Sequence, residues 1–237
     1  MKNLKKGLFT LILFTNILNA QEVYATFNVQ ASKNAHLAFN SSGIVNHIYV
    51  DVSSEIKKGD TLAKLHNNDH KAMVAISQTA LKYAKRDYNR QVKVKHMIDK
   101  AKFDQYAYKH ENAKNQLRYQ QALLAKTTLK APFDGIIYEK SVEIGDMVSG
   151  QMKTIVFKIQ SKNARKLVLE FDQKYHKIIK IGDVFNYKLD GDTTPYQGKI
   201  TKIYPYANNK TRKISAEVLC KDLMVGLFGD GYITSKN

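Results

Sequence analysis

Few side chains in this 237-residue chain are spaced for chemistry. On a helix, the four-residue spacing of His66 and His70 would present two imidazoles to a metal ion. Only two convergent ligands are visible, at what reads as a sheet-to-helix junction, so a structural or surface role is the favoured interpretation. Glu170, Asp190 and Asp192 have no fixed partner for acid–base work, and no nucleophile triad or phosphate-binding glycine loop stands out. We therefore expect no enzymatic activity, no metal and no cofactor.

Two related segments, far apart in the chain, repeat one pattern. The first reads Gly43-Ile-Val and continues to Gly59-Asp60, and the second reads Gly135-Ile-Ile and continues to Gly145-Asp146. In each, a strand start is followed by a turn and then by another apolar residue. The pattern indicates two halves of one small β-domain, with a long segment inserted between them.

The second copy is preceded by the run Ala131-Pro-Phe-Asp-Gly135. Pro132 cannot continue a helix and pushes Ala131 towards extended geometry, so it should turn the end of the insertion into the β-domain. Gly135 and Gly145 are expected where a Cβ would oppose the backbone conformation or a close approach. We assign structural roles to Gly43, Gly59, Ala131, Pro132, Phe133, Asp134, Gly135 and Gly145.

The insertion, residues 69–127, contains no Pro and no Gly, and good helix formers dominate it. Each half carries a row of residues at alternating steps of three and four, the pattern of a coiled-coil seam. The first row is Met73, Ile76, Ala80, Tyr83, Asp87, Arg90, Val94 and Met97. The second row is Phe103, Tyr106, His110, Ala113, Leu117, Gln120 and Leu124. We expect an antiparallel hairpin that turns near Met97, with Asp99 capping the second helix.

The hairpin is strongly basic, with thirteen Lys and Arg against five Asp and Glu. Most of these charges are expected to form a solvated surface. Several lysines nevertheless crowd the turn, where their mutual repulsion stabilises no helix, so we predict that the tip docks an acidic partner. The predicted contact residues are Val94, Lys95, Met97, Ile98, Asp99, Lys100, Lys102 and Phe103.

Residues 161–237 read as short alternating strands separated by Gly and Asp turns, which predicts a small antiparallel β-barrel. Asp172 is expected to cap a short helix, and Pro205 to end a strand that begins at Tyr196. An N-terminal strand within residues 21–38 is expected to join the barrel. Cys220, the one cysteine, excludes an internal disulfide and reads as a small packed hydrophobe.

Residues 1–20 have the features of a secretory signal peptide, with a lysine-rich start, an apolar run from Gly7 to Leu18, and Ala20 before the expected cut. The run is shorter than the roughly 20 residues that a spanning helix needs, and an uncleaved anchor is the alternative. The chain has a net charge of +17. Export argues against nucleic acid as a partner and leaves an anionic membrane surface or an acidic protein.

The paired half-motifs, the A-P-F-D-G run and the inserted hairpin resemble the membrane fusion protein family, the RND-type and HlyD-like periplasmic adaptors of tripartite efflux pumps. The resemblance implies a mainly β fold with an inserted α-helical hairpin: a lipoyl-like (barrel-sandwich hybrid) domain, an antiparallel coiled coil and a small antiparallel β-barrel. The implied parts are a signal peptide (1–20), a barrel strand (21–38), the two lipoyl-like halves (39–68 and 128–160), the hairpin (69–127) and the barrel (161–237).

The resemblance also implies a function. Such an adaptor is a homo-oligomeric ring or sleeve in the periplasm that couples an inner-membrane efflux transporter to an outer-membrane channel without catalysis. Its hairpin tips meet the channel, and it is associated with the inner membrane through its transporter, with peripheral membrane contact left open. The alternative is a periplasmic metal- or small-ligand-binding module that feeds a transporter.

Overall fold

The computed structural model describes residues 21–235, which divide into two compact units. One unit holds the residues up to Gln30 together with those from Asn163 onward, and the other holds Ala31–Lys162. The expected signal peptide lies outside the described residues. Within the described range, no helix combines the length and the apolar character needed to cross a membrane.

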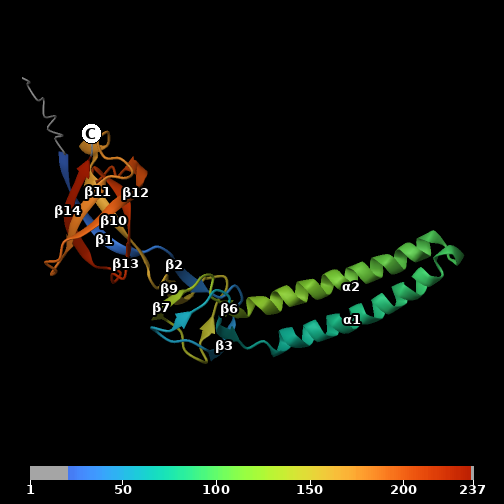
Figure 1. Cartoon of the computed structure of the whole chain (residues 1–237). Helices are drawn as coiled ribbons and strands as arrows, with labels where there is room; N and C mark the ends of the chain where they lie inside the picture. The colour runs from blue at the N-terminus through green and yellow to red at the C-terminus, as the bar shows by residue number, and fades with distance from the viewer. Residues whose placement is uncertain (1–20, 236–237) are drawn as a thin grey trace, which may run out of the picture. The chain divides into compact units, whose positions relative to one another are not determined.

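The first unit is a closed β-barrel (Figure 1), as predicted. Around the barrel the strands are β1 (Gln21–Ala31), β10 (Ala164–Asp172), β13 (Lys213–Lys221), β12 (Tyr196–Ala207), β11 (Val184–Leu189) and β14 (Phe228–Ser235). Alternate residues of β10, namely Leu167, Leu169 and Phe171, are buried inside, as the two-residue period of a strand requires. Phe27 and Phe185 meet edge to face in the same core, with ring centroids 5.7 Å apart.

Cys220 lies near the end of β13 and packs against the barrel core. Burial raises the pKa of its thiol to about 11. The thiol is therefore protonated at neutral pH, which fits a packing role rather than a nucleophilic one.

Two details of the barrel differ from the sequence prediction. β12 does not end at Pro205 but continues to Ala207. The register with β13 shifts between Ile203 and Ala207, so Pro205 lies in an unpaired bulge where its missing N–H costs no ladder hydrogen bond. After Asp172 the chain forms only a 3₁₀ turn, η2 (Gln173–Tyr175), whose backbone N–H donates to the Asp172 carboxylate at 2.9 Å.

The second unit contains two four-stranded sheets. The first sheet has the order β2 (Asn34–Ala38), β9 (Ile155–Gln160), β7 (Gly135–Lys140) and β4 (Glu55–Ile56). The second has the order β6 (Thr128–Lys130), β5 (Thr61–Leu65), β3 (Gly43–Ile48) and β8 (Met147–Val148). Each sheet joins strands of both half-motifs, since β4 pairs with β7 and β3 pairs with β8. The two halves therefore build one β-domain around a shared core that includes Leu62, Leu65 and Phe157.

The N-terminal region is a further correction. The sequence prediction gives residues 21–38 to the barrel, whereas the structure gives β2 to the second unit, paired with β9. A bend at Ser32 and Lys33 separates β1 from β2. The bend is held by Ser161, whose backbone N–H donates to the Lys33 carbonyl at 2.9 Å.

The Gly-Asp turns share one geometry. Gly59 has a φ of +94°, and the Asp60 carboxylate accepts the backbone N–H of Lys57 at 2.8 Å. The Gly59 N–H donates to the Ala131 carbonyl at 2.8 Å, and the Ala131 N–H donates back to the Asp60 carbonyl at 2.9 Å. Equivalent turns lie at Gly145-Asp146, bonded to Val45, and in the barrel at Gly182-Asp183, bonded to Ile200. Glycine is required at each first position because a side chain there would be strained at positive φ.

The insertion consists of α1 (Asn68–Lys93) and α2 (Lys100–Lys126), joined by a turn that contains the 3₁₀ segment η1 (Lys95–Met97). The helices run antiparallel and side by side (Figure 1), which confirms the predicted hairpin. At its base the Asn67 amide donates to the Thr127 hydroxyl at 3.1 Å, and both residues are buried. The two ends of the insertion are thereby joined where they meet the β-domain.

Candidate functional site

The Ala131–Gly135 motif ties the exit of the hairpin to the first half of the β-domain. The Asp134 carboxylate accepts the backbone N–H of Lys58 at 2.7 Å, beside the two hydrogen bonds that join Ala131 to the Gly59-Asp60 turn. Gly135 has no room for a side chain, because a Cβ would lie 2.2 Å from the carbonyl oxygen of Gln160. These contacts fix the path of the chain from β6 to β7 within the β-domain.

The remaining motif residues contribute in smaller ways. Pro132 lies two residues after the end of β6, so the chain has left the helix and entered the β-domain before it, and the expected turning role of Pro132 is wrong. Phe133 is partly buried against the core, with the Lys33 ammonium 5.9 Å from its ring centroid. Gly145 has a φ of +98°. A Cβ at Gly43 would meet Leu65 at an ordinary 3.4 Å, so this glycine is not required by close contact.

The predicted seam of α2 coincides with the residues that the helix turns towards α1. Every residue of that row is buried or half-buried: Phe103, Tyr106, His110, Ala113, Leu117, Gln120 and Leu124. Residues between them, such as Tyr108 and Tyr119, are exposed. The 3–4 spacing therefore identified the inner face of the second helix.

The predicted seam of α1 is wrong by one residue. Met73, Ile76 and Tyr83 are 45%, 62% and 48% exposed, and Val94 and Met97 are exposed as well. The inner row is instead His70, Val74, Ser77, Leu81, Ala84, Tyr88 and Gln91. This row has the same 3–4 spacing but includes small and polar residues. The hydrophobic pattern of the sequence therefore favours the neighbouring row, which is more hydrophobic.

The tip of the hairpin is an ordered turn. The Asp99 carboxylate accepts the backbone N–H groups of Ala101 and Lys102 at 2.8 and 3.2 Å, which confirms the predicted cap. Below it, the Tyr88 ring packs against Phe103, with centroids 5.7 Å apart. Tyr88 also stacks on His110, with centroids 5.2 Å apart, a contact that the sequence prediction did not include. The position of Tyr88 in the true seam of α1 is the signal that identifies it.

The predicted contact residues of the tip divide into two groups. Met97 is 85% exposed, and Lys100 and Lys102 are exposed without an ion pair in the described part of the chain. Ile98 and Phe103 are half-buried, which corrects the expectation that Ile98 is exposed. The free apolar surface at the tip is therefore provided mainly by Met97, and Val94 adds a smaller part.

The two histidines considered for a metal lie at the start of α1. His66 is exposed just before the helix, with a ring nitrogen 3.4 Å from the Asn68 amide, and His70 is half-buried in the first turn. Among residues 21–235, no three His, Cys, Asp or Glu side chains come together as they would to hold a metal ion.

The chain matches the model of one protein family and is similar to known proteins. The model of the CzcB-like barrel-sandwich hybrid domain matches residues 33–160, more than half of the chain. The cobalt-zinc-cadmium resistance protein CzcB of Cupriavidus metallidurans is 22% identical over 203 residues, covering 78% of this chain. The alignment spans only 39% of that protein.

Two solved structures share the fold. A chimera of MacA and MexA, with the Pseudomonas aeruginosa MexA α-hairpin domain, has a TM-score of 0.84 at 18% identity and covers 91% of this chain and 82% of its own. The membrane fusion protein Spr0693 from Streptococcus pneumoniae R6 has a TM-score of 0.73 at 17% identity and covers 91% and 100% of the two chains. The chain therefore belongs to the family of the CzcB-like barrel-sandwich hybrid domain.

Proposed function

We propose that this chain is the periplasmic adaptor of an efflux pump. It links an inner-membrane transporter to an outer-membrane channel, acts as a homo-oligomeric ring or sleeve, and performs no catalysis. The observation that carries the proposal is the helical hairpin inserted into a barrel-sandwich hybrid domain of the CzcB-like family, in a chain that also has a barrel.

The geometry of the hairpin supports a bridging role. With 27 residues, α2 extends for about 40 Å at 1.5 Å per residue. The turn is capped by Asp99, which gives the tip a defined shape, and Met97 and the lysines around it are exposed. An exposed apolar side chain within a basic cluster suits contact with an acidic protein surface that has an apolar centre.

The substrates to test first are divalent metal cations. One relative, CzcB of Cupriavidus metallidurans, is named for resistance to cobalt, zinc and cadmium. We extend that substrate class to this chain only as part of the proposal. An adaptor can serve such transport without holding the metal itself, since the transporter selects the substrate.

The reach of the hairpin provides the experiment. Deleting residues 74–80 and 114–120 together removes one heptad from each arm at matching height, since Asn67 faces Thr127 at the base. The seam keeps its register, and the hairpin shortens by about 10 Å. In a strain that lacks the native gene, the shortened chain should fail to restore tolerance to zinc, cobalt or cadmium. The matched control keeps the full-length hairpin and carries Lys82→Gln and Lys114→Gln. This control should restore tolerance to these metals.

Full tolerance with the shortened chain would contradict a bridging role. The strain should also be challenged with organic toxicants. If the shortened chain loses tolerance to those compounds alone, the adaptor role stands, but the substrates are organic compounds rather than metal cations. The alternative of a metal-binding module predicts stoichiometric zinc binding by the purified chain in equilibrium dialysis.

A further inference from the structure

The two ends of the barrel differ in charge. Residues 173–183, which follow β10, and residues 208–212, which follow β12, lie at one end, because Asp172 pairs with Lys213 and Ala207 pairs with Ile214. The backbone N–H of Gln173 donates to the Arg212 carbonyl at 3.0 Å, so the two segments touch. We call this the basic end. Its cations are Lys174, Lys177, Lys180, Lys210, Arg212 and Lys213.

Two carboxylates at the basic end accept backbone N–H groups, and Glu22, which pairs with Thr234, is a third acidic group there. The carboxylate of Asp172 accepts the backbone N–H of Lys174 at 2.9 Å, and that of Asp183 accepts the N–H of Lys180 at 2.8 Å. Among the cations, Lys213 alone forms an ion pair within residues 21–235, to Glu170 at 3.5 Å. The other five have no carboxylate partner in that range, so the excess positive charge faces solvent.

The opposite end of the barrel does not share this excess of cations, although Arg165 at the start of β10 also lies there, since Ala164 pairs with Lys221. Residues 188–195 and 221–230 carry four aspartates, Asp190, Asp192, Asp222 and Asp230, against two lysines, Lys188 and Lys221. The positive charge of the basic end is therefore not the average property of a basic chain. It is concentrated at one end of one unit.

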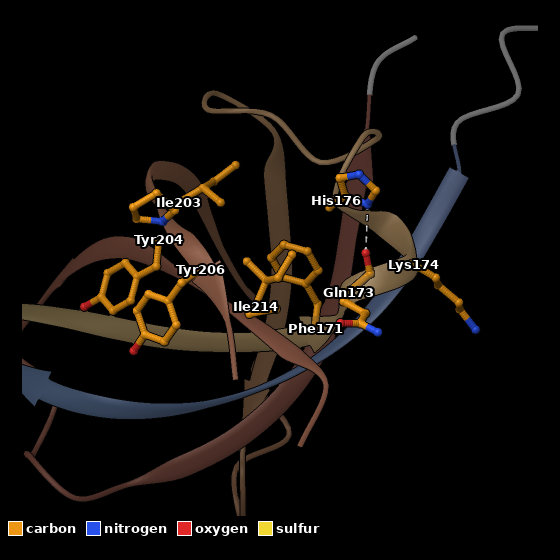
Figure 2. A pocket seen from close by; sticks show the side chains of 10 residues that line it. Phe171, Gln173, Lys174, His176, Ile203, Tyr204, Tyr206 and Ile214 are labelled. Atoms are coloured by element: carbon orange, nitrogen blue, oxygen red, sulfur yellow. Dashed lines mark hydrogen bonds between the residues drawn. The ribbon is translucent and has the colours of Figure 1, made fainter. Parts of the chain in front are cut away.

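An apolar pocket opens beside the basic end. The β12 bulge leaves Tyr204, Pro205 and Tyr206 unpaired with β13, and the space between this bulge and η2 is a pocket of about 560 Å³. Figure 2 shows Phe171 and Ile214 in its centre, with Tyr204 and Tyr206 side by side on one flank and Gln173 and His176 on the other.

The tyrosines give the pocket an amphipathic rim. The two ring centroids are 6.2 Å apart, and Tyr206 is 62% exposed. Tyrosine combines an apolar ring with a polar hydroxyl, so it is enriched at membrane–water interfaces. An exposed tyrosine beside lysines that have no ion pair in the described residues is a combination that binds the headgroup region of an anionic bilayer.

The chain also enters the barrel at this end. Gln21 pairs with Ser235, whose hydroxyl donates to the Ile178 carbonyl at 3.1 Å. The apolar run from Gly7 to Leu18 lies directly before Gln21 in the sequence. The basic end is thus the end of the barrel at which the chain emerges from the predicted signal peptide.

We propose that the basic end of the barrel docks on a membrane surface rich in anionic phospholipid. The lysines of residues 173–183 and 208–212 bind the headgroup phosphates, and Tyr206 with Pro205 lies at the level of the headgroups. The proposal rests on the proposed function, in which the protein works at the inner membrane. Two observations favour the membrane over an acidic protein partner: Tyr206 is exposed beside the lysines, and the chain enters the barrel at this end through Gln21.

The test measures binding of the full chain, as processed and purified from its cell, to vesicles of phosphatidylcholine with and without phosphatidylglycerol. The variant carries Lys174→Gln, Lys177→Gln and Lys210→Gln. The control carries Lys82→Gln, Lys85→Gln and Lys93→Gln on the exposed face of α1, which removes the same charge. Each lysine near an anionic surface changes binding by about fivefold, so the variant should bind anionic vesicles about a hundredfold more weakly than the control.

Further measurements test the apolar contact of Tyr206 and distinguish a lipid ligand from an acidic polypeptide. Tyr206→Ser should weaken binding to anionic vesicles without changing its salt dependence, since it removes no charge. If the variant with Lys174, Lys177 and Lys210 changed to Gln binds anionic vesicles as tightly as its control, the proposal is overturned. It is also overturned if polyglutamate displaces the protein from vesicles at matched charge concentration, since the surface would then favour an acidic polypeptide. Vesicle binding needs neither transporter nor channel, so its failure leaves the adaptor function standing, and the hairpin deletion tests that function separately.

Discussion

At the scale of single residues, two features of the Ala131–Gly135 motif set the path of the chain from β6 to β7 within the β-domain. Asp134 reaches the backbone of the first half-motif, and Gly135 lets the chain pass against the Gln160 carbonyl. Neither residue has a catalytic partner in the described structure. Their contribution is to hold two segments together that are separated by the whole hairpin.

Gly135→Ala should destabilise the β-domain. The added Cβ would lie 2.2 Å from a backbone oxygen that cannot rotate away, so strands β7 and β9 must separate, at a cost of about 1–3 kcal/mol. Gly43→Ala is the matched control, because its Cβ would meet only the side chain of Leu65 at 3.4 Å. Thermal unfolding should show a clearly lower melting temperature for Gly135→Ala and little change for Gly43→Ala. Equal melting temperatures would refute this account of the motif.

A second residue-scale feature is the buried carboxylate of Glu217 in the barrel. It accepts hydrogen bonds from the Lys166 ammonium at 2.6 Å and from the Tyr204 hydroxyl at 2.7 Å. Burial by itself would raise the pKa of the Glu217 carboxyl, but these two donors outweigh it and hold the pKa below its ordinary value of 4.5. The folded state therefore favours the ionised carboxylate.

Because the pKa is lowered by folding, the stability that Glu217 contributes is present above pH 4.5 and is lost as the pH falls through the folded pKa. Glu217→Gln should lower the free energy of unfolding by about 1–3 kcal/mol at neutral pH and reduce its decline in acid. Glu170→Gln is the control, since that exposed carboxylate lies 3.5 Å from Lys213. Chemical denaturation from pH 7 to pH 3 checks both variants. An unchanged pH profile in Glu217→Gln would rule out this role.

At the scale of elements, the hairpin depends on which row of α1 faces α2. The structure places Leu81 and Tyr88 inside and leaves Ile76 on the exposed side of the helix. Both rows repeat at steps of three and four, so their spacing is the same. They differ in what they contact, and a substitution can distinguish them.

Leu81→Asp should open the hairpin, because it places a charge in the seam, where it finds no partner. Ile76→Asp should be tolerated, since Ile76 is 62% exposed, and both variants carry the same intrinsic cost of Asp in a helix. Hydrogen exchange of α1 and α2 amides checks the pair. Faster amide exchange in the Ile76 variant than in the Leu81 variant would show that the row predicted from the sequence, which contains Ile76, faces α2.

The elements also show how far the sequence could be read. The seam of α2 was predictable because Phe103, Leu117 and Leu124 are its most hydrophobic regular row. The seam of α1 was not, because Ser77 and Ala84 contribute little hydrophobicity, while Met73 and Ile76 form a stronger row that the structure leaves exposed. Periodicity gave the helices and the turn, but the facing row is decided by contact across the hairpin.

The β-elements show the same limit. The Gly-Asp turns and the alternation in β10 predicted the two β-units, since these signals are local. The path of Pro205 through β12 was not predictable, because it depends on a register shift relative to β13. The transfer of β2 to the second unit depends likewise on a distant partner, the strand β9. At the tip, the Asp99 cap followed from its position, whereas the Tyr88 stack required the true helix face.

At the scale of the whole molecule, the chain combines a closed barrel, a barrel-sandwich hybrid domain and a long hairpin, in the CzcB-like family. The described parts contain side chains suited to contact: Met97 with lysines at the hairpin tip, and tyrosines with lysines at the basic end of the barrel. The proposed adaptor uses these as separate surfaces, the tip for a channel protein and the barrel end for the membrane.

The central claim is that the hairpin tip contacts an outer-membrane channel, and crosslinking in living cells tests it most directly. A photoreactive residue replaces Met97, which is 85% exposed at the tip, or Tyr119, which is 58% exposed along α2. The account predicts a crosslink from position 97 to an outer-membrane channel protein, its weakening when Lys100 and Lys102 are changed to Glu, and no such crosslink from position 119. Absence of a channel crosslink at position 97 in cells that still export the substrate, or an equal crosslink at position 119, would contradict it.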